Sequence, residues 1–416
     1  MSGVDSAPLW LWRAGGELVA EGVPIRELAE RFGTPLYLYS AQAIERNVAR
    51  IREACAGLPL RLFYAVKANS NGAILRLLCR EGLGAEVVSQ GELVRALWAG
   101  FPPDRLLFTG PGKQEEELRL AAGRGIYALV VESLEELELL KAFGKKVRVA
   151  LRLNLGLAVA THPGLATSAV GTKFGLDREE LARAMELLEQ APHLELVGLH
   201  THLGSQISQI DPYLSALSYL KAVAEDLQRN RFALRFLDLG GGFALDFPFW
   251  ELACRIKDAN LSGLEIYFEP GRAVVGNAGC LIARVLYTKT VHGKNFVIVD
   301  AAMNDLLRPA LYGAKHPVWV EPQREGEATE VIIAGPVCES TDTFGVYTLP
   351  PLRPGDFLVF LHAGAYGFSM ASQYNSRPRP AEVLLFAGRP WQIRAREEVA
   401  ELTRGEEVPE WLSTGG

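Results

Sequence analysis

A lysine ends one apolar stretch of the chain where a charged amine is hard to accommodate. Residues 63–71 read FYAVKANSN, and Lys67 follows a run with the composition of a buried strand. Burying an ammonium costs free energy unless the group is paired, deprotonated or chemically bound. Lys67 is therefore either a lysine whose head reaches solvent or a carboxylate, or one whose amine forms a Schiff base with a carbonyl group. Its neighbours must decide between these.

A glycine run and an acidic turn supply groups that could hold a phosphorylated cofactor. The stretch DLGGGF places Gly240, Gly241 and Gly242 after an apolar run, where backbone N–H groups can approach an anion closely. The stretch EPGR supplies Glu269 and Arg272. A carboxylate beside a pyridine nitrogen keeps that nitrogen protonated and makes the ring an electron sink. Without a ligand, these motifs would be a tight turn and an ordinary ion pair.

Two histidines, His200 and His202, lie two residues apart in HTHLGSQ and would share one face of a strand. That spacing suits the metal ligands of barrel hydrolases, but a metal site needs three or four ligands. We place no other histidine at the end of a barrel strand, so we expect no metal. A flat cofactor stacked on one histidine ring, with Ser205 donating to its phosphate, fits the stretch better.

A cysteine near the C-terminus stands in a polar turn, GPVCESTD, where Cys338 is followed by Glu339. Free cysteines are usually buried and inert, so this one is a candidate acid–base group. Arginine is well suited to gripping a carboxylate. Nearby motifs supply cationic, phenolic and amide groups that could hold a substrate: Arg308, Tyr312, Tyr366, Tyr374 and Asn375.

Eight apolar runs alternate with helical stretches between about residues 60 and 272, the pattern of a parallel sheet. Eight βα units favour a closed (β/α)8 TIM-like barrel of the α/β class over an open sheet, and active sites of such barrels lie at the C-terminal strand ends. The polar residues above fall at those ends, as do Arg152, Asn154 and Ser89, which forms a capping box with Glu92. We expect strands at 62–66, 85–88, 105–108, 127–131, 147–153, 196–200, 236–240 and 265–269.

A second, mostly antiparallel β-barrel or sandwich domain is expected after the helical spacing ends. Its β-like runs lie at 280–291, 295–301, 330–335, 357–361 and 381–386. A predicted hairpin, with strands at 9–12 and 17–20, and a short helix at 24–33 precede the barrel and should join this domain. We therefore assign 36–276 to a barrel that binds the cofactor. Residues 1–35 and 277–416 form a discontinuous β domain that contributes substrate and dimer-interface residues.

Composition and charge exclude several kinds of partner. The 416 residues are 49% hydrophobic and 22% charged, with a formal net charge of −6, as in ordinary globular proteins. No basic face suits nucleic acid, and no apolar stretch approaches the roughly 18–20 residues that span a bilayer. The five scattered cysteines form neither a zinc ribbon nor a disulfide framework. Without a secretory signal at the N-terminus, we expect a cytoplasmic protein.

Nine motifs, in order, resemble those of the diaminopimelate decarboxylases, which belong with ornithine and arginine decarboxylases to the fold-type III pyridoxal phosphate enzymes. The resemblance covers about residues 22–385, and the combination is far more specific than any one motif. The motifs are FYAVKANSN, GLGAEVVSQGEL, THPGLATSAVGTKFGLD, HLGSQI, DLGGGF, EPGR, MNDLLRPALY, GPVCES and GAYGFSMASQYNSRPRPAEV.

The resemblance implies a barrel plus a β domain, pyridoxal 5'-phosphate as cofactor, and a homodimer whose subunits share active sites. Lys67 would form the Schiff base, Glu269 would face the pyridine nitrogen, and His202 would stack on the ring. Cys338 of the second subunit would return a proton after carbon dioxide leaves. Further cofactor contacts would come from Ser205, Gly241, Gly242, Gly271, Arg272 and Tyr366, and the substrate would be held by Arg272, Arg308, Tyr312, Glu339 and Tyr366.

The substrate-holding groups favour an amino acid charged at both ends. Arg308 and Tyr312 suggest a distal carboxylate, and Glu339 a distal ammonium. Meso-2,6-diaminopimelate has both, whereas ornithine and lysine lack the distal carboxylate, so we expect its decarboxylation to L-lysine, the last step of lysine biosynthesis. The alternative is a related decarboxylase acting on ornithine, lysine, arginine or a carboxylated polyamine. An inactive relative that binds partners would be expected to lack Lys67 or Cys338.

The chain also departs from the family's usual pattern. Glu86 stands where the family usually has Asp, and Ala302 where it has Gly. NLGLAV follows Arg152 in place of an NPDV-like stretch, and residues 243–265 form a shorter segment than usual. For Lys67 we further expect that burial favours the neutral amine.

Overall fold

The computed structural model describes residues 8–156, 171–230, 232–261 and 263–413. The first ten residues of the motif at 161–177, and part of NLGLAV, lie outside this range. Internal contacts divide the chain into two compact units. One, called here the barrel unit, comprises Ser40–Ala278 and Gly364–Ser369. The other, the β unit, comprises Leu9–Tyr39, Gly279–Ala363 and the residues from Met370 onward.

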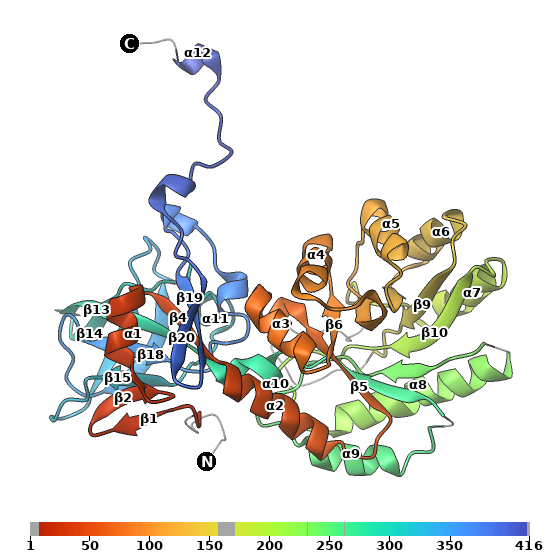
Figure 1. Cartoon of the computed structure of the whole chain (residues 1–416), viewed down its shortest axis with the longest axis horizontal. Coiled ribbons are helices and arrows are strands. Elements are labelled where there is room, and N and C mark those ends of the chain that lie inside the picture. The colour runs from red at the N-terminus through yellow and green to blue at the C-terminus, as the bar shows by residue number, and fades with distance from the viewer. Residues whose placement is uncertain (1–7, 157–170, 231, 262, 414–416) are drawn as a thin grey trace. The chain divides into compact units, whose positions relative to one another are not determined.

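The barrel unit contains a closed barrel of eight strands, which confirms the predicted (β/α)8 fold (Figure 1). Each strand pairs in parallel with the next, and the last pairs with the first to close the ring. The strands are β5 (Leu60–Ala65), β6 (Gly84–Val87), β7 (Leu106–Phe108), β8 (Ala128–Val131), β9 (Val147–Arg152), β10 (Leu194–His200), β11 (Phe236–Asp238) and β12 (Glu265–Phe268). We call their C-terminal ends the barrel mouth.

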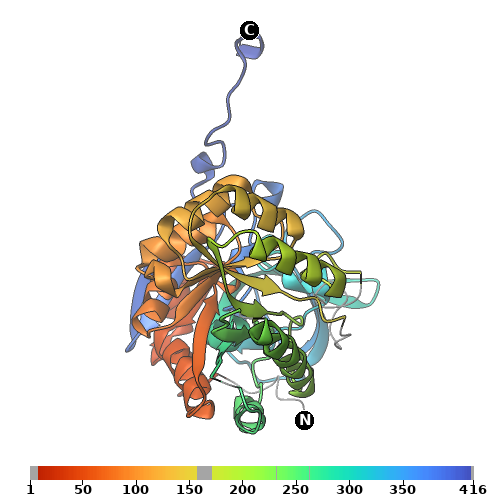
Figure 2. The same ribbon diagram turned by 90° about the vertical axis from the view of Figure 1, so that its right-hand side faces the viewer.

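Helices surround the barrel, and Figure 2 looks onto this ring. Among the described residues, no helix combines the length and apolar character needed to cross a membrane. The helices of this unit are α2 (Ala41–Ala54), α3 (Gly72–Arg80), α4 (Gln90–Ala99), α5 (Glu115–Arg124), α6 (Leu134–Ala142), α7 (Arg178–Glu189), α8 (Asp211–Arg229), α9 (Phe249–Lys257) and α10 (Arg272–Val275).

Local capping signals begin and end helix α4 directly beyond strand β6. The Ser89 hydroxyl accepts the N–H of Glu92 at 3.2 Å, as its predicted capping role requires. The Glu92 carboxylate accepts the N–H of Val88 at 2.9 Å instead of that of Ser89, so the predicted capping box is only half formed. The helix ends at Gly100, whose φ of 101° suits glycine. The strand end therefore leads into a short loop at the barrel mouth.

An aromatic cluster fills part of the barrel interior. Phe63, Tyr127, Phe236 and Tyr267 are buried together, and the rings of Phe236 and Tyr267 stack with centroids 4.2 Å apart. Gly198 on β10 leaves room for this stack, because a Cβ there would lie 2.4 Å from the Phe236 ring. The packing gives the barrel a solid interior beneath its mouth.

The β unit is built mainly from a nine-stranded sheet, in agreement with the predicted β domain. Six of its pairings are antiparallel, and β14 pairs with β16 in parallel. The sheet contains β4 (Leu36–Ser40), β13 (Gly279–Val291), β14 (Lys294–Val299), β15 (Val318–Glu321), β16 (Thr329–Ala334), β17 (Thr343–Leu349), β18 (Phe357–Phe360), β19 (Ala381–Phe386) and β20 (Arg389–Arg394). Helices α11 (Arg308–Tyr312) and α12 (Glu410–Ser413) complete the unit.

The predicted N-terminal hairpin is present, although its first strand starts two residues later than expected. It consists of β1 (Leu11–Ala14) and β2 (Glu17–Ala20), and β3 (Val23–Pro24) extends it to a sheet of three strands. Helix α1 (Ile25–Phe32) follows and ends at Gly33, as predicted. These residues group with the β unit.

Two segments belong to a different unit from the one that the predicted domain boundaries at 36 and 277 assign them to. Strand β4 pairs with β13 and groups with the β unit. Residues Gly364–Ser369 group with the barrel unit, where backbone hydrogen bonds hold them. Gly364 donates to the carbonyl of Gly276 at 3.1 Å, and Tyr366 to that of Ala68 at 2.7 Å. This segment carries a residue predicted to bind the cofactor.

Replacing Phe236 tests the aromatic cluster. We expect Phe236→Ala to lower the free energy of unfolding by about 3–5 kcal/mol, because the ring is fully buried and its loss leaves a cavity. Trp250→Ala, where the side chain is 68% exposed, should change it by no more than about 0.5 kcal/mol. Urea unfolding measures both. Equal effects of the two substitutions would contradict the packing described here.

Candidate active site

Lys67 lies in one turn of 3-10 helix, Val66–Ala68, directly after β5. Its ammonium donates to both carboxylate oxygens of Glu86, on neighbouring strand β6, at 3.0 Å each. Glu86 is fully buried and also accepts the hydroxyl of Thr109, which follows β7. The lysine side chain is 33% exposed. A buried carboxylate thus holds the lysine at the barrel mouth, while part of the side chain stays accessible.

The protonation state of this pair differs from what the sequence suggested. Burial by itself lowers the pKa of Lys67, as expected, but the charge of Glu86 and more distant groups outweigh burial and raise it. Burial raises the pKa of Glu86, and Lys67 opposes that effect. The pair is an ammonium with a carboxylate. The expectation of a neutral amine is wrong because it considered burial without a charged partner.

Glu269 follows β12 and is buried beside the two predicted histidines. Its Oε1 lies 3.3 Å from Nε2 of His200, and its Oε2 lies 3.8 Å from Nδ1 of His202. Burial would raise the pKa of Glu269, but its interactions, of which that with His200 is the largest, outweigh burial and lower it. The side chain is therefore a carboxylate, the form that a protonated ring nitrogen requires.

His202 is held in one tautomer. The N–H of Gly241 donates to its Nδ1 at 3.1 Å, so this nitrogen is an acceptor and the ring proton is on Nε2. Burial is the main reason that the pKa of His202 falls to about 4. The ring is neutral at physiological pH, and a neutral flat ring is suited to stacking on another aromatic ring.

Asp238, which ends β11, is a site residue that the sequence analysis missed. It is fully buried, and its Oδ1 accepts the N–H of Gly240 at 2.8 Å. Burial and then the charge of Glu269 raise its pKa well above the usual value. The raised pKa favours the protonated form of Asp238 beside the carboxylate of Glu269. The signal was present in DLGGGF, where an acid stands at the end of a predicted strand.

Asp238, His200 and Glu269 also offer donor atoms that all lie within 4.8 Å of one another, as metal ligands do. The sequence analysis set a metal aside by counting histidines and did not consider this carboxylate. The hydrogen bond from Gly240 occupies one Asp238 oxygen. The absence of a metal therefore stays a prediction.

The glycine run forms a loop that only glycine can form. A Cβ at Gly241 would lie 2.2 Å from the carbonyl oxygen of Glu269, and one at Gly242 would lie 2.3 Å from that of Gly204. Gly242 has a φ of 88°. The Tyr213 hydroxyl donates to the carbonyl of Gly241 at 2.8 Å and fixes the loop. A bare backbone at a strand end leaves room for an anion to approach.

Three predicted cofactor residues from distant parts of the chain lie together beside this loop. Arg272, at the start of α10, donates to the hydroxyl of Ser205 at 3.4 Å. Its guanidinium carbon lies 4.9 Å from the ring centre of Tyr366. Gly271 packs against the turn that carries the lysine, since a Cβ there would lie 2.8 Å from that of Ala68. A cation and a hydroxyl in one place suit a phosphate.

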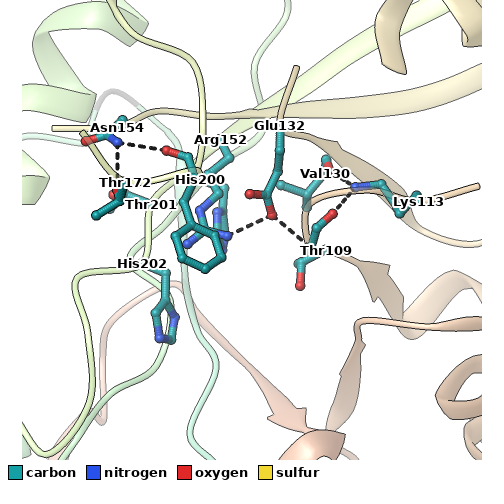
Figure 3. A network of polar contacts seen from close by, with 12 residues as sticks. Thr109, Lys113, Val130, Glu132, Arg152, Asn154, Thr172, His200, Thr201 and His202 are labelled. Carbon is teal, nitrogen blue, oxygen red and sulfur yellow. Dashed lines mark hydrogen bonds and ion pairs between the residues drawn. The ribbon is translucent and has the colours of Figure 1, made fainter. Parts of the chain in front are cut away.

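Arg152 belongs to a buried network at the ends of β8 and β9 (Figure 3). Its Nη1 donates to Oε1 of Glu132 at 2.7 Å, and the same oxygen accepts the N–H of Gly110 at 2.8 Å. Lys113 pairs with Glu136 at 3.1 Å and donates to the carbonyl of Gly110. Sequence reasoning placed the arginine at the barrel mouth but found neither acid. The network fixes one wall of the mouth.

The predicted substrate residues of the β unit lie on and near α11. Arg308 begins this helix and is 5% exposed, and Tyr312 ends it. The helix stops at Gly313, whose φ of 61° suits glycine. One guanidinium nitrogen of Arg308 lies 3.0 Å from Nε2 of His316. Pro309 occupies the second helical position, where the N–H that proline lacks would have no partner within the helix.

Cys338 is exposed in a turn that Asp342 organises. The two carboxylate oxygens of Asp342 accept the N–H groups of Val337 and Met303, each at 2.7 Å. The N–H of Cys338 donates to the side chain of Asn375 at 3.0 Å. The bond between Met303 and Asp342 ties this turn to the segment that leads into α11. Asp342 stood in the quoted turn, but nothing in its spacing indicated this role.

Glu339, next to the cysteine, is exposed and accepts the hydroxyl of Tyr374 at 2.7 Å. This bond with Glu339 is the main cause that raises the pKa of Tyr374. Tyr374 and Asn375 were both considered as donors, and the structure brings them to the cysteine turn. The β unit thus holds an exposed thiol beside an exposed carboxylate.

The predicted residues fall into two sets, one in each unit. The barrel unit brings together an amine, a carboxylate, a neutral imidazole, a glycine loop and an arginine. This donor set fits pyridoxal 5'-phosphate, which needs an amine for its aldehyde, a partner for its ring nitrogen and a cradle for its phosphate. The β unit carries the thiol and the groups suited to a charged substrate.

The chain belongs to the pyridoxal-dependent decarboxylase family, whose pyridoxal-binding domain model matches residues 41–276. A diaminopimelate decarboxylase of Pseudomonas aeruginosa is 41% identical over 403 residues, which cover 94% of this chain and 97% of that protein. The structure of diaminopimelate decarboxylase from Helicobacter pylori complexed with L-lysine is 40% identical, with a TM-score of 0.87 over 91% of this chain and 98% of that one. Lysine/ornithine decarboxylase from Vibrio vulnificus, complexed with cadaverine, is 26% identical, with a TM-score of 0.78 over 87% and 97%.

Gly241→Ala tests the glycine loop. The added Cβ would lie 2.2 Å from the Glu269 carbonyl and must displace it. We expect the dissociation constant of pyridoxal 5'-phosphate to rise by about ten- to hundredfold. Gly91→Ala in α4 is the control, since its nearest contact would be 3.8 Å away. Fluorescence titration with the cofactor measures both, and an unchanged affinity in Gly241→Ala would remove the loop from the binding site.

The pKa of His202 predicts a dependence of stability on pH. Because the folded value of about 4 lies below the ordinary 6.5, the unfolded chain takes up this proton first as the pH falls. The contribution of neutral His202 to the free energy of unfolding is complete above about pH 6.5. It is lost as the pH falls towards 4, by up to about 3 kcal/mol. We expect His202→Phe to lose less stability than the native chain between pH 7 and 4.5. Urea unfolding at several pH values measures this, and parallel curves would contradict it.

Proposed function

We propose that this chain decarboxylates meso-2,6-diaminopimelate to L-lysine and carbon dioxide, as a pyridoxal-phosphate-dependent carboxy-lyase in the last step of lysine biosynthesis. The observation that carries the proposal is the barrel-mouth amine Lys67, paired with a buried carboxylate and accompanied by an ionised Glu269. Relatives at about 40% identity over nearly the whole chain have this activity in their names.

The barrel unit supplies the cofactor site. When bound, pyridoxal 5'-phosphate supplies a protonated ring that takes up the electron pair released as carbon dioxide leaves. Lys67 would hold the cofactor through its amine and release it to the amine of the substrate. Before it can do so, its ammonium must lose a proton, and Glu86 is a buried acceptor 3.0 Å away. Glu269 keeps the ring nitrogen protonated, and His202 stacks on the ring.

The phosphate is held by the loop and the cation beside it. Gly241 and Gly242 offer a bare backbone, and Gly271 precedes the arginine. Arg272 supplies the charge, with hydroxyls from Ser205 and Tyr366. The Arg272–Ser205 hydrogen bond and the Arg272–Tyr366 contact support this assignment, because they already gather the three side chains.

The β unit supplies substrate and proton-transfer groups. Arg308 and Tyr312 bind the distal carboxylate and Glu339 the distal ammonium, while Arg272 and Tyr366 also contact the substrate. Cys338 returns a proton to the carbon that has lost its carboxylate. This charge pattern favours meso-diaminopimelate over ornithine, lysine, arginine or a carboxylated polyamine, which are the alternative substrates.

We further propose a homodimer in which Cys338 and Glu339 serve the partner's barrel. Their exposure in this chain supports a role towards another surface. We also propose that the enzyme acts in the cytoplasm on small molecules, without nucleic acid or membrane partners. Equilibrium sedimentation of the native protein measures the assembly.

A panel of amino acids tests the substrate. We expect the purified enzyme to release carbon dioxide from meso-diaminopimelate, with at most weak release from ornithine, lysine or arginine. Release from ornithine or lysine alone would replace the proposed substrate. Lys67→Ala is the control for the cofactor and should lose the visible absorbance band of the bound group. Cys338→Ala should keep that band but slow turnover by about 10²–10⁴-fold, as expected for loss of a general acid. Near-normal turnover would exclude this thiol as the main donor.

A further inference from the structure

His316 is a buried histidine of the β unit that the proposed reaction does not use. It lies between α11 and β15 and is 1% exposed. Its ring touches two groups of opposite character. Nε2 lies 3.0 Å from Nη1 of Arg308, and Nδ1 lies 2.8 Å from the carbonyl oxygen of Leu361.

These two contacts determine the tautomer of the ring. The carbonyl of Leu361 can only accept, so Nδ1 of His316 carries a proton and donates it. The guanidinium of Arg308 can only donate, so Nε2 is unprotonated and accepts. Both bonds form only with a neutral imidazole, because a proton on Nε2 would face the arginine cation. The histidine is therefore an oriented link between a backbone carbonyl and the guanidinium.

The backbone on both sides of this link is also fixed. The Tyr347 hydroxyl donates to the carbonyl of His316 at 2.9 Å. The N–H of Leu361 donates to the carbonyl of Pro317 at 2.8 Å. Leu361 directly follows β18, so the ring is anchored to the sheet at its Nδ1 side. A rigid ring on such an anchor holds the guanidinium in one direction.

We infer that His316 is a positioning residue for substrate binding, which orients Arg308 towards the distal carboxylate of the substrate. This inference rests on the proposed function. A carboxylate in the place of this ring would neutralise the guanidinium and compete with the substrate, whereas an imidazole accepts one hydrogen bond and adds no charge. The ring thereby fixes the plane of the guanidinium, and with it the direction from which a carboxylate can meet the arginine.

Two substitutions separate the two contacts of the ring. In His316→Gln, the amide oxygen can reach the position of Nε2 and accept from Arg308. In His316→Asn, the amide nitrogen can replace Nδ1 and donate to Leu361, but nothing reaches the arginine. We expect His316→Asn to raise the KM for meso-diaminopimelate about tenfold or more, with little change in kcat. The KM of His316→Gln should lie within about threefold of the native value. His292→Asn, at an exposed histidine of the same unit, should change neither constant.

A double-mutant cycle completes the test. Because His316 acts through Arg308, introducing His316→Asn into an Arg308→Gln enzyme should raise its KM little further. Additive effects of the two substitutions on KM, or an unchanged KM in His316→Asn, would overturn the inference. A near-native KM in His316→Asn together with a raised KM in His316→Gln would also overturn it, because only the contact with Leu361 would then matter. Thermal unfolding shows whether each variant is folded. If His316→Asn is not folded, the KM of His316→Gln decides: a value within about threefold of the native enzyme supports the inference, and a tenfold rise overturns it. Failure of the proposed function is distinct, since the native enzyme would then not act on meso-diaminopimelate, and the inference would fall with it.

Discussion

Burial of charge at the barrel mouth is the constraint on which the site depends. Parallel strands of a closed barrel bring their C-terminal ends to one place, and this chain puts several ionisable side chains there. An unpaired charge in such surroundings is costly, so each must find a partner across the ring. Lys67 finds Glu86 on the adjacent strand, and Arg152 finds Glu132. These pairs hold their side chains in fixed positions before any ligand arrives.

Pairing also decides which groups carry charge. Lys67 is an ammonium because its partner outweighs burial, so its reaction with an aldehyde begins with loss of a proton. Glu86 has its own pKa raised by burial, which makes it a better acceptor than an exposed carboxylate. The Glu86 side chain reaches the amine with both oxygens and so holds the lysine firmly.

The sequence could predict what is local and what repeats. Alternating apolar and helical runs gave all eight barrel strands, and strand-end positions located Lys67 and Glu269. Strands β17 and β20 were missed although their partners β16 and β19 lie close by in the chain, because Gly345 and Pro390 interrupt their runs. Strands β4 and β15 were missed because their partners β13 and β18 lie far away in the chain. Partners across the fold were missed for the same reason. Glu132, Asp342 and His316 become recognisable only when folding brings them to their targets.

At the barrel mouth, the charge of Glu269 depends on neighbours that its own sequence motif does not indicate. Glu269 and Asp238 are both buried, and two adjacent negative charges there would repel each other. Burial and the charge of Glu269 raise the pKa of Asp238, which favours the protonated acid. Interactions led by that with His200 lower the pKa of Glu269 against the effect of burial. The two shifts favour negative charge on Glu269, the residue that the motif EPGR identifies, and so explain how this residue can meet a protonated ring nitrogen.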